Sequence, residues 1–273
     1  MRQNARHSGT QTSDKFCVFC GATGQGVVTR EHVLPDWLNN HIVVRSDIGL
    51  ESWRASGQLI ETKERRGKLF ARRPWIACKK CNNGWMGKLE SEAIPLLKPM
   101  LDGRTIGVGF WEQATLATWA VKTCLALQWA RHDINSLVPE RHFREIAAKR
   151  GATPPRDVEV FLGYMRNIPV EQDRRYHALA YSARKRDVES DNSGLENANT
   201  YLLTLRVYHV VFQVVGSQNV PEDLGPWIHP YEPLHILRIW PRASVVANWP
   251  PPGAVEEREG GFNLLASRPE QWD

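Results

Sequence analysis

Two Cys-x-x-Cys pairs are the residues of this chain whose type and spacing are best suited to metal chemistry. They are Cys17 with Cys20, and Cys78 with Cys81. Four thiolates at this spacing are typical of a closed tetrahedral zinc site, which builds structure rather than performing a reaction. The 57 residues between the pairs (21–77) are compatible with a single site, because the cost of closing a loop rises slowly with its length. We therefore expect a structural Zn²⁺ ion.

The other cysteine usage supports metal binding over disulfides. The chain has five cysteines, and in a reducing cytosol paired Cys-x-x-Cys motifs indicate a metal site. Cys124 lies in an apolar helical stretch and is expected to be a small buried hydrophobic residue. The first residues are polar, without the apolar segment of a secretory signal, and no run approaches the roughly 20 apolar residues of a membrane helix. We expect a cytoplasmic protein that does not associate with membranes.

A second group of polar residues flanks the two pairs. Glu31 and His32 follow a β-branched run, and Asn82 comes directly after Cys81. Neutral imidazole is well suited to take a proton from water near pH 7, and Glu and Asn supply the oxygen atoms that Mg²⁺ prefers. Neighbours on a strand point to opposite faces, so Glu31 and His32 are expected to do different jobs. The alternatives are that His32 binds zinc or is structural, and that Asn82 caps a helix.

These motifs together resemble an HNH endonuclease of the zinc-stapled kind, over roughly residues 16–95. The matching residues are Cys17-x-x-Cys20, Glu31-His32-Val33-x-Pro35 and Cys78-x-x-Cys81-Asn82. The resemblance implies a ββα-metal fold in which His32 is the general base. It also implies that Glu31 and Asn82 hold a catalytic Mg²⁺ or Mn²⁺ ion, with Asn83 as the fallback ligand if the helix starts one residue later.

The chain departs from the family pattern at two places. Many members carry an Asn shortly before the second Cys-x-x-Cys pair, where it orients the base, but residues 71–77 contain none. The metal-binding position also holds Glu31 in place of Asp or His. Another group must therefore orient His32, or the activity must be weaker than is usual in the family.

Positive charge is concentrated beside the cysteine pairs. Residues 41–90 contain 11 Lys or Arg and 5 Asp or Glu, a net charge of +6, whereas the whole chain carries +5. Such an excess is what binding to a polyanionic backbone requires. The candidate phosphate contacts are Arg72, Arg73, Lys79 and Lys80, which would position DNA rather than read its bases. The alternatives are that these are solvated surface charges, or that the partner is RNA.

The remaining pattern predicts an α+β fold. A helix is expected from Asn82 toward Ile94, ended or kinked by Pro95 and Pro99. Residues 41–77 are expected to form one or two hairpins, residues 113–131 a helix buried on most sides, and residues 139–150 a further helix. Strands of an antiparallel sheet are then expected at 158–164, 176–181, 201–206, 210–215 and 234–240.

The expected organisation is a flexible tail at residues 1–13, a nuclease zinc module with a basic insertion at 14–104, and a helical and antiparallel-sheet domain of unknown role at 105–273. The leading hypothesis is a metal-dependent endonuclease that hydrolyses phosphodiester bonds in DNA, in restriction or phage defence by resemblance. One alternative is a non-catalytic, zinc-dependent nucleic-acid-binding protein with a degenerate centre. Another is a protein-binding module, and the last region could also dimerise or bind an activating partner.

Overall fold

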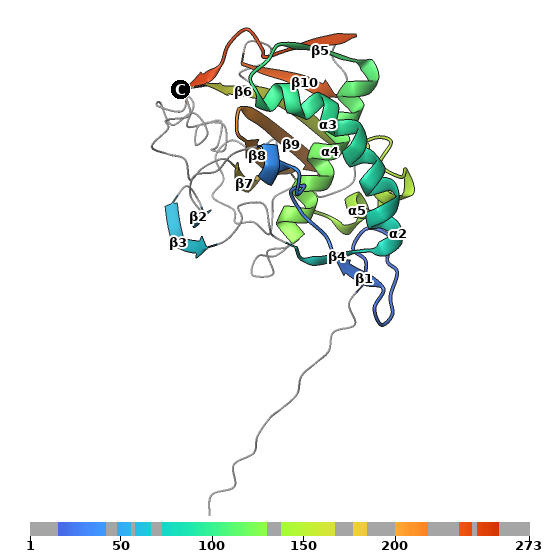
Figure 1. The fold of residues 1–273 in the computed structure, drawn as a ribbon. Coiled ribbons are helices and arrows are strands. Elements are labelled where there is room, and N and C mark those ends of the chain that lie inside the picture. The colour runs from blue at the N-terminus through green and yellow to red at the C-terminus, as the bar shows by residue number, and fades with distance from the viewer. Residues whose placement is uncertain are drawn as a thin grey trace, which may run out of the picture.

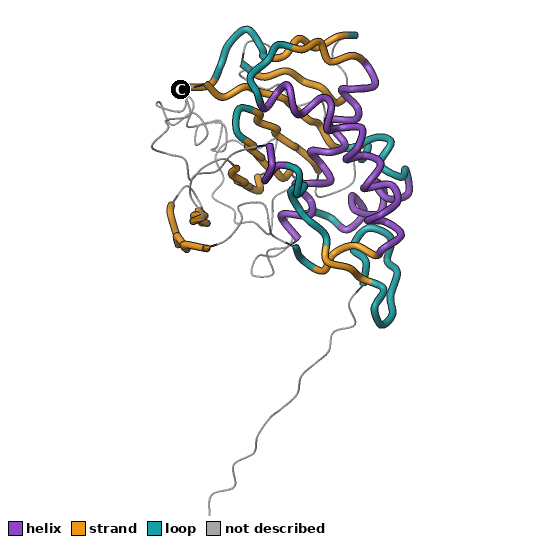
Figure 2. The backbone as a smooth tube through the Cα atoms, in the orientation of Figure 1, coloured by secondary structure: helices purple, strands orange, loops and turns teal. Residues whose placement is uncertain are grey.

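The computed structural model combines helices and sheets in an α+β arrangement (Figures 1 and 2). It describes residues 16–41, 48–55, 58–66, 73–129, 138–166, 177–184, 200–217, 235–241 and 245–256. Helices α3 (Gly87–Leu101), α4 (Phe110–Trp129) and α5 (Glu140–Ala148) lie together on one side of the largest sheet (Figure 1). Helix α4 contacts the sheet directly, and α3 and α5 both pack on α4.

The largest sheet confirms every strand that the sequence predicted after residue 157. It has six strands, with β10, β6, β9, β8 and β7 antiparallel in that order and β12 added parallel to β6. The strands are β6 (Val158–Arg166), β7 (His177–Arg184), β8 (Thr200–Val207), β9 (Val210–Ser217), β10 (Ile236–Trp240) and β12 (Val255–Glu256). Strand β9 is buried along its whole length, as its nearly continuous apolar sequence requires of a central strand.

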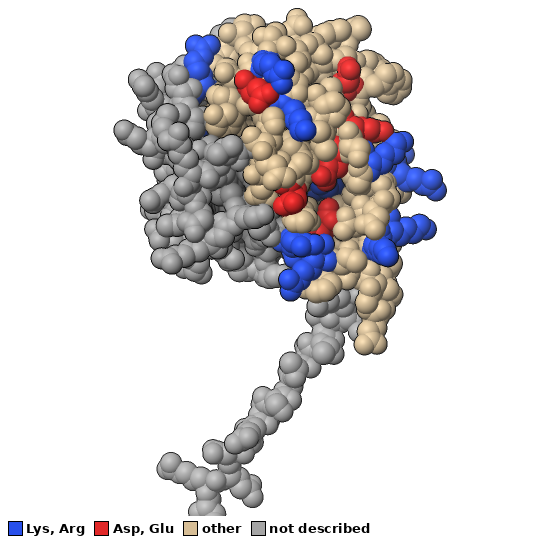
Figure 3. Space-filling model, viewed as in Figure 1, with Lys and Arg blue, Asp and Glu red and all other residues tan. Residues whose placement is uncertain are grey.

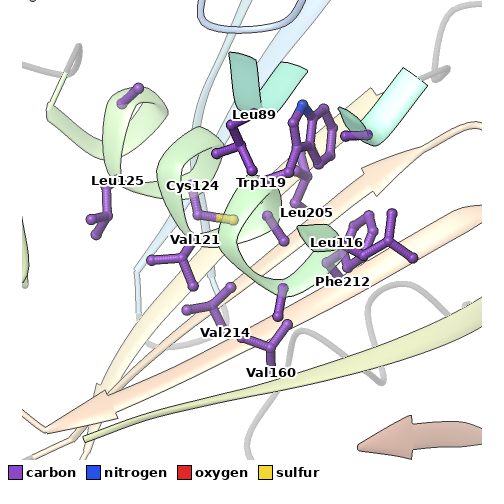
Figure 4. Packing of buried hydrophobic residues seen from close by; sticks show 14 of the residues in the cluster. Leu89, Leu116, Trp119, Val121, Cys124, Leu125, Val160, Leu205, Phe212 and Val214 are labelled. Atoms are coloured by element: carbon purple, nitrogen blue, oxygen red, sulfur yellow. The ribbon is translucent and has the colours of Figure 1, made fainter. Parts of the chain in front are cut away.

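The core lies between this sheet and α4. Leu116, Val121 and Cys124 of α4 point toward Phe212 and Val214 of β9 (Figure 4). From Gln113 to Gln128 nearly every residue of α4 is buried, which confirms the predicted helix without a polar face. One continuous cluster of buried apolar side chains runs from Cys17 to Trp249. The division expected at residue 104 stays a prediction.

The N-terminal part is built from short elements. Strand β1 (Val28–Arg30) pairs antiparallel with β4 (Trp75–Cys78), and α1 (Leu38–His41) lies between them in the sequence. Strands β2 (Ile48–Ala55) and β3 (Gln58–Arg66) form one antiparallel hairpin, as predicted for the insertion. After β4 come α2 (Lys79–Cys81), the π-helical segment η1 (Asn82–Met86) and α3. The tail expected at residues 1–13 lies outside the described residues.

Two expectations about this region were wrong or incomplete. Helix α3 continues through Pro95 and Pro99 to Leu101 instead of ending near Ile94. Its buried face packs into the core, and this packing outweighs the backbone hydrogen bonds that proline removes. The sequence pattern also missed strand β5 (Ile106–Gly109), which pairs with β11 (Val246–Trp249) across most of the chain.

Substitution of Gly151 tests the packing of the segment after α5 against Trp85. It follows α5 at φ +70°, and a Cβ atom there would lie 2.7 Å from Cε3 of Trp85. Gly151→Ala is expected to lower the free energy of unfolding by about 2–4 kcal/mol in urea denaturation, from left-handed strain plus overpacking. Gly26→Ala is the matched control, because Gly26 has φ +72° with no atom within 4 Å of the added Cβ. It should cost about 1 kcal/mol; equal losses in the two variants would contradict the role of Trp85.

A buried polar network joins α5 to the sheet. The Asp157 carboxylate accepts a hydrogen bond from Nε2 of His142 at 2.9 Å and pairs with Arg141, while Nδ1 of His142 lies 2.8 Å from the Tyr201 hydroxyl. Burial would raise the pKa of Asp157, but His142 and then Arg141 outweigh it and hold that pKa below its ordinary value. The network therefore stabilises the fold in the ionised form of Asp157.

Removing the Asp157 carboxylate should lower the free energy of unfolding above about pH 4 but not below it. Asp157→Ala is expected to lose about 3 kcal/mol at pH 7, because it leaves buried partners unpaired. Since the folded-state pKa is depressed, the stabilisation is complete above the unfolded pKa of about 3.9 and is lost as pH falls through the folded value. Urea denaturation of both proteins between pH 7 and pH 3 should show the difference shrinking below about pH 4. A constant difference would argue against the ionised pair. Glu92→Ala, at a half-exposed pair with Lys88, is the control.

Candidate metal centre

The first cysteine pair lies in a tight loop. Cys17 N–H donates to the Ala22 carbonyl at 2.9 Å, and Gly21 N–H donates to the Cys17 carbonyl at 2.8 Å. Gly21 has φ +78°, a conformation that glycine adopts without steric cost, so the chain can turn back after Cys20. Val18 N–H donates to the Ile76 carbonyl of β4 at 3.0 Å and fixes this loop beside the second pair.

The second pair lies where β4 ends and α2 begins. Cys78 is the last residue of β4 and the N-cap of α2, and its Sγ accepts a hydrogen bond from Cys81 N–H at 3.4 Å. This N–H···S bond turns the Cys81 side chain back toward Cys78. The geometry of both pairs therefore follows from local backbone hydrogen bonding.

All four sulfur atoms meet in one cluster. The Sγ atoms of Cys17, Cys20, Cys78 and Cys81 lie within 4.8 Å of one another, and Cys20 and Cys78 are 3.6 Å apart. Zinc–sulfur bonds of about 2.3 Å place tetrahedral ligands roughly 3.8 Å apart, so the cluster fits a zinc ion. The thiols are free of disulfides. A hydrogen bond from Cys81 lowers the pKa of Cys17, which favours the thiolate form that binds metal.

Side chains of η1 and α5 contact the first cysteine loop. Phe19 packs edge-on against Trp85 of η1 and against Phe143 of α5, with ring centroids 5.5 and 5.6 Å apart. Arg144 of α5 donates from Nη1 to the Cys17 carbonyl at 3.3 Å. The cysteine cluster is therefore continuous with the helical layer, and residues after 139 help to support it.

Glu31 and His32 follow β1 in an extended loop. Glu31 N–H donates to the Pro74 carbonyl at 3.1 Å, which extends the pairing of β1 with β4 by one residue. Glu31 is 7% exposed, whereas the His32 side chain is 30% exposed, and both residues lie outside a strand, so the different jobs expected of them stay a prediction. Among the described residues, the group of metal-ligating side chains around Cys17 does not include His32. Nε2 of His32 lies 4.0 Å from Oδ1 of Asp36.

Asn82 comes close to Glu31, although the two are far apart in the sequence. Its amide donates to Oγ1 of Thr29 at 3.4 Å, two residues before Glu31, and the Asn82 side chain lowers the pKa of the Glu31 carboxylate slightly against the larger effect of burial. Asn82 is not the N-cap of the helix, because Cys78 holds that position. Asn83, the fallback ligand, is exposed at the next position. Of the two asparagines, Asn82 is the one that contacts Glu31.

Two further residues, which the sequence reasoning missed, face the same place. Burial raises the pKa of Glu31 to about 7, the Glu90 carboxylate of α3 adds to the rise, and Lys122 of α4 opposes it. Burial likewise raises the pKa of Glu90, which interacts with Lys122 and His32. Burial lowers the pKa of Lys122, which is 1% exposed. A usable signal existed, because Lys122 is the only charged residue between Gln113 and Trp129.

Three of the four predicted phosphate contacts are among the described residues, and all three lie at the surface. Arg73, Lys79 and Lys80 are exposed next to β4 and α2, and Arg72 lies outside the described residues. The guanidinium of Arg30 lies over the Trp75 ring, 5.3 Å from its centroid. On the face drawn in Figure 3, acidic side chains gather near the middle, with basic side chains below them and along one edge.

A shallow hollow of about 440 Å³ lies elsewhere, over α5. It is lined by Arg141, Glu145, Ala148, Lys149, Arg156 and Asp157. Its charges are paired with each other, as in Lys149 with Glu145 at 2.7 Å. It does not contain the predicted site residues. Among the described helices, none has the length and apolarity needed to cross a bilayer.

Comparison with known families, curated proteins and solved structures finds no match to this chain. The description of this region therefore depends on its own residues: a cysteine tetrad fit for zinc, and a separate group of interacting side chains, Glu31, Asn82, Glu90 and Lys122.

The tetrad predicts a bound metal that can be removed selectively. The purified protein should carry about one zinc ion per chain by elemental analysis. Cys81→Ser is expected to lose that zinc and to lower the melting temperature, because metal-binding energy is folding energy at such sites. Cys124→Ser is the matched control, since Cys124 is buried in α4 and lies outside the tetrad. Full zinc content in Cys81→Ser would refute the site.

Proposed function

We propose that this chain is a zinc-stabilised endonuclease that hydrolyses phosphodiester bonds in DNA with the help of a second, divalent cation. The observation that supports the proposal is the approach of Asn82 to the end of β1. Its amide donates to Oγ1 of Thr29 at 3.4 Å, two residues before Glu31, and Asn82 follows directly after Cys81 of the tetrad. His32 lies next to Glu31 in the sequence and is partly exposed.

The local order of elements supports an HNH-like unit. Strands β1 and β4 pair antiparallel, and α2, η1 and α3 follow directly. This is the order of a ββα-metal module, with the hairpin β2–β3 inserted between its two strands. The π-helical turn at Asn82–Met86, which contains non-helical Gly84, falls at the proposed ligand Asn82. Such turns are common at functional sites.

The chemistry assigns one role to each residue. His32 is the general base that takes the proton of the attacking water, and its partial exposure gives water access. Asp36 is the nearest described acid to its ring, so it can stabilise the imidazolium in place of the missing family Asn. Glu31 and Asn82 present oxygen atoms, which suit Mg²⁺ or Mn²⁺. The bound cation would supply charge relief on the phosphoryl oxygens.

The exposed cations beside the site account for substrate binding. Arg73, Lys79 and Lys80 are in position to contact a phosphate backbone, within a region of net charge +6. Cleavage of DNA, a role in restriction or phage defence, and a cytoplasmic location rest on the resemblance. RNA as substrate and a second copy or activating partner on the C-terminal sheet remain further hypotheses.

The second candidate function is nucleic-acid binding without cleavage. Two observations favour it: residues 71–77, just before the second cysteine pair, contain no Asn, and Glu31 is almost fully buried. In that case the protein should bind DNA with an affinity that falls steeply with salt, and should leave the DNA intact in Mg²⁺ or Mn²⁺.

His32→Ala distinguishes these functions. The wild type is expected to nick supercoiled plasmid in Mn²⁺ or Mg²⁺, and the variant should be slower by about 10²- to 10⁴-fold, because the general base is lost. Its zinc content and melting temperature should not change. Asn82→Ala should also lose activity, and retention there with loss in Asn83→Ala would move the ligand to Asn83. A wild type that binds DNA but never cuts it would overturn the nuclease proposal.

A further inference from the structure

We propose that Glu90 and Lys122 complete the divalent-cation site: Glu90 is a carboxylate ligand beside Glu31 and Asn82, and the Lys122 ammonium balances the charge of the carboxylate pair. The inference rests on the proposed function in one respect, namely that the cation is the one the cleavage reaction uses. It adds two residues that the HNH-like motifs do not contain, one of them from a helix beyond residue 104.

The burial of Lys122 is the first observation. Lys122 is 1% exposed in the middle of α4, whose neighbouring Val121 and Cys124 face the apolar core (Figure 4). Within the described part of the chain it forms no hydrogen bond and no ion pair within 4.0 Å. A lone ammonium in such a place is strongly unfavourable unless charges of opposite sign compensate it. The only groups that interact with it electrostatically there are Glu90 and Glu31.

The convergence of the two acids is the second observation. Glu31 comes from the loop after β1 and Glu90 from α3, eight residues beyond Asn82. Glu31 is 7% exposed and Glu90 is half-buried, and the Glu90 carboxylate raises the cost of ionising Glu31. A purely structural lysine would close into an ion pair with one of them. Among the described residues, the ammonium forms no ion pair within 4.0 Å with either carboxylate, although both interact with it electrostatically.

The donor chemistry indicates which ion these groups suit. Glu31, Glu90 and Asn82 offer oxygen atoms from three separate elements, the loop after β1, α3 and η1, and hard divalent cations prefer such ligands with water in the remaining positions. The two carboxylates and one ammonium leave a single negative charge. A divalent cation reverses this to a single positive charge, which one phosphodiester group neutralises. Glu90 also interacts with His32, so the same carboxylate connects the cation position to the proposed base.

The test is Mn²⁺ binding to the full-length, zinc-loaded protein without DNA, by calorimetry at pH 8 and confirmed by electron paramagnetic resonance. Glu90→Gln is expected to weaken Mn²⁺ binding about tenfold or more, since a charged ligand is lost. Lys122→Met should tighten it about tenfold, because a positive charge next to the cation is removed. Lys122→Arg should bind Mn²⁺ as the wild type does. Both Glu90→Gln and Lys122→Met should nick plasmid at least tenfold more slowly than the wild type.

Two matched controls distinguish an effect of the substituted charge on Mn²⁺ affinity from an effect of altered folding. Glu92→Gln lies on α3 at a half-exposed position, and Thr123→Val replaces a buried hydroxyl next to Lys122 that has no described hydrogen-bond partner. Neither should change Mn²⁺ affinity. Lys122→Met should melt no lower than the wild type, since a packed apolar side chain often replaces a buried charge without loss. If it fails to fold, Glu90→Gln and Lys122→Arg still decide the question.

The outcomes of the inference and of the proposed function are distinguishable. Wild-type cleavage with unchanged Mn²⁺ affinity and activity in Glu90→Gln and Lys122→Met would keep the nuclease and overturn the extended site. Mn²⁺ binding that responds to both substitutions in a protein that cuts no DNA would keep the cation site and overturn the nuclease. A wild type that binds no Mn²⁺ would overturn the inference.

Discussion

Four sulfur atoms set the geometry on which the rest of the site depends. The tetrad joins the loop at 16–26 to the junction of β4 with α2, in addition to the hydrogen bond from Val18 N–H to the Ile76 carbonyl. Because β1 leads to Glu31 and α2 leads to Asn82, fixing the cysteines also fixes the distance between these two side chains. In the proposed function, a zinc ion here would contribute to chemistry only indirectly, by positioning the oxygen donors of the proposed cation site.

Buried charged side chains occur in two different arrangements in this molecule, one with direct ion pairs and one without. Around α5, Asp157 is satisfied by direct contact with His142 and Arg141, and the network ties the helix to the sheet. Lys122, by contrast, is buried near Glu31, which is buried, and Glu90, which is half-buried, and forms no described ion pair within 4.0 Å with either. The first arrangement is complete and stabilises the fold. The second is incomplete, and groups of this kind are characteristic of sites that bind a ligand.

This contrast gives the C-terminal half a role in the site. The sheet buries α4 on one side, and α3 covers it on another, so the position of Lys122 is fixed by the core rather than by the cysteine module. Arg144 and Phe143 of α5 hold the first cysteine loop in the same way. The helices after residue 104 thus support the tetrad and supply one of its charged neighbours. A rigid packed helix positions a charge more accurately than a surface loop does.

The sequence by itself determined the features that depend on local pattern. Spacing identified the tetrad, β-branched runs identified the strands from β6 to β10, and unbroken apolarity identified α4 as a buried helix. Tertiary structure alone decided the burial of Glu31, the approach of Glu90 and Lys122, and the pairing of β5 with β11. Tertiary packing also allows α3 to continue past Pro95 and Pro99 to Leu101. These outcomes arise from contacts between segments distant in the chain, where packing outweighs local preference, and no short-range pattern encodes them.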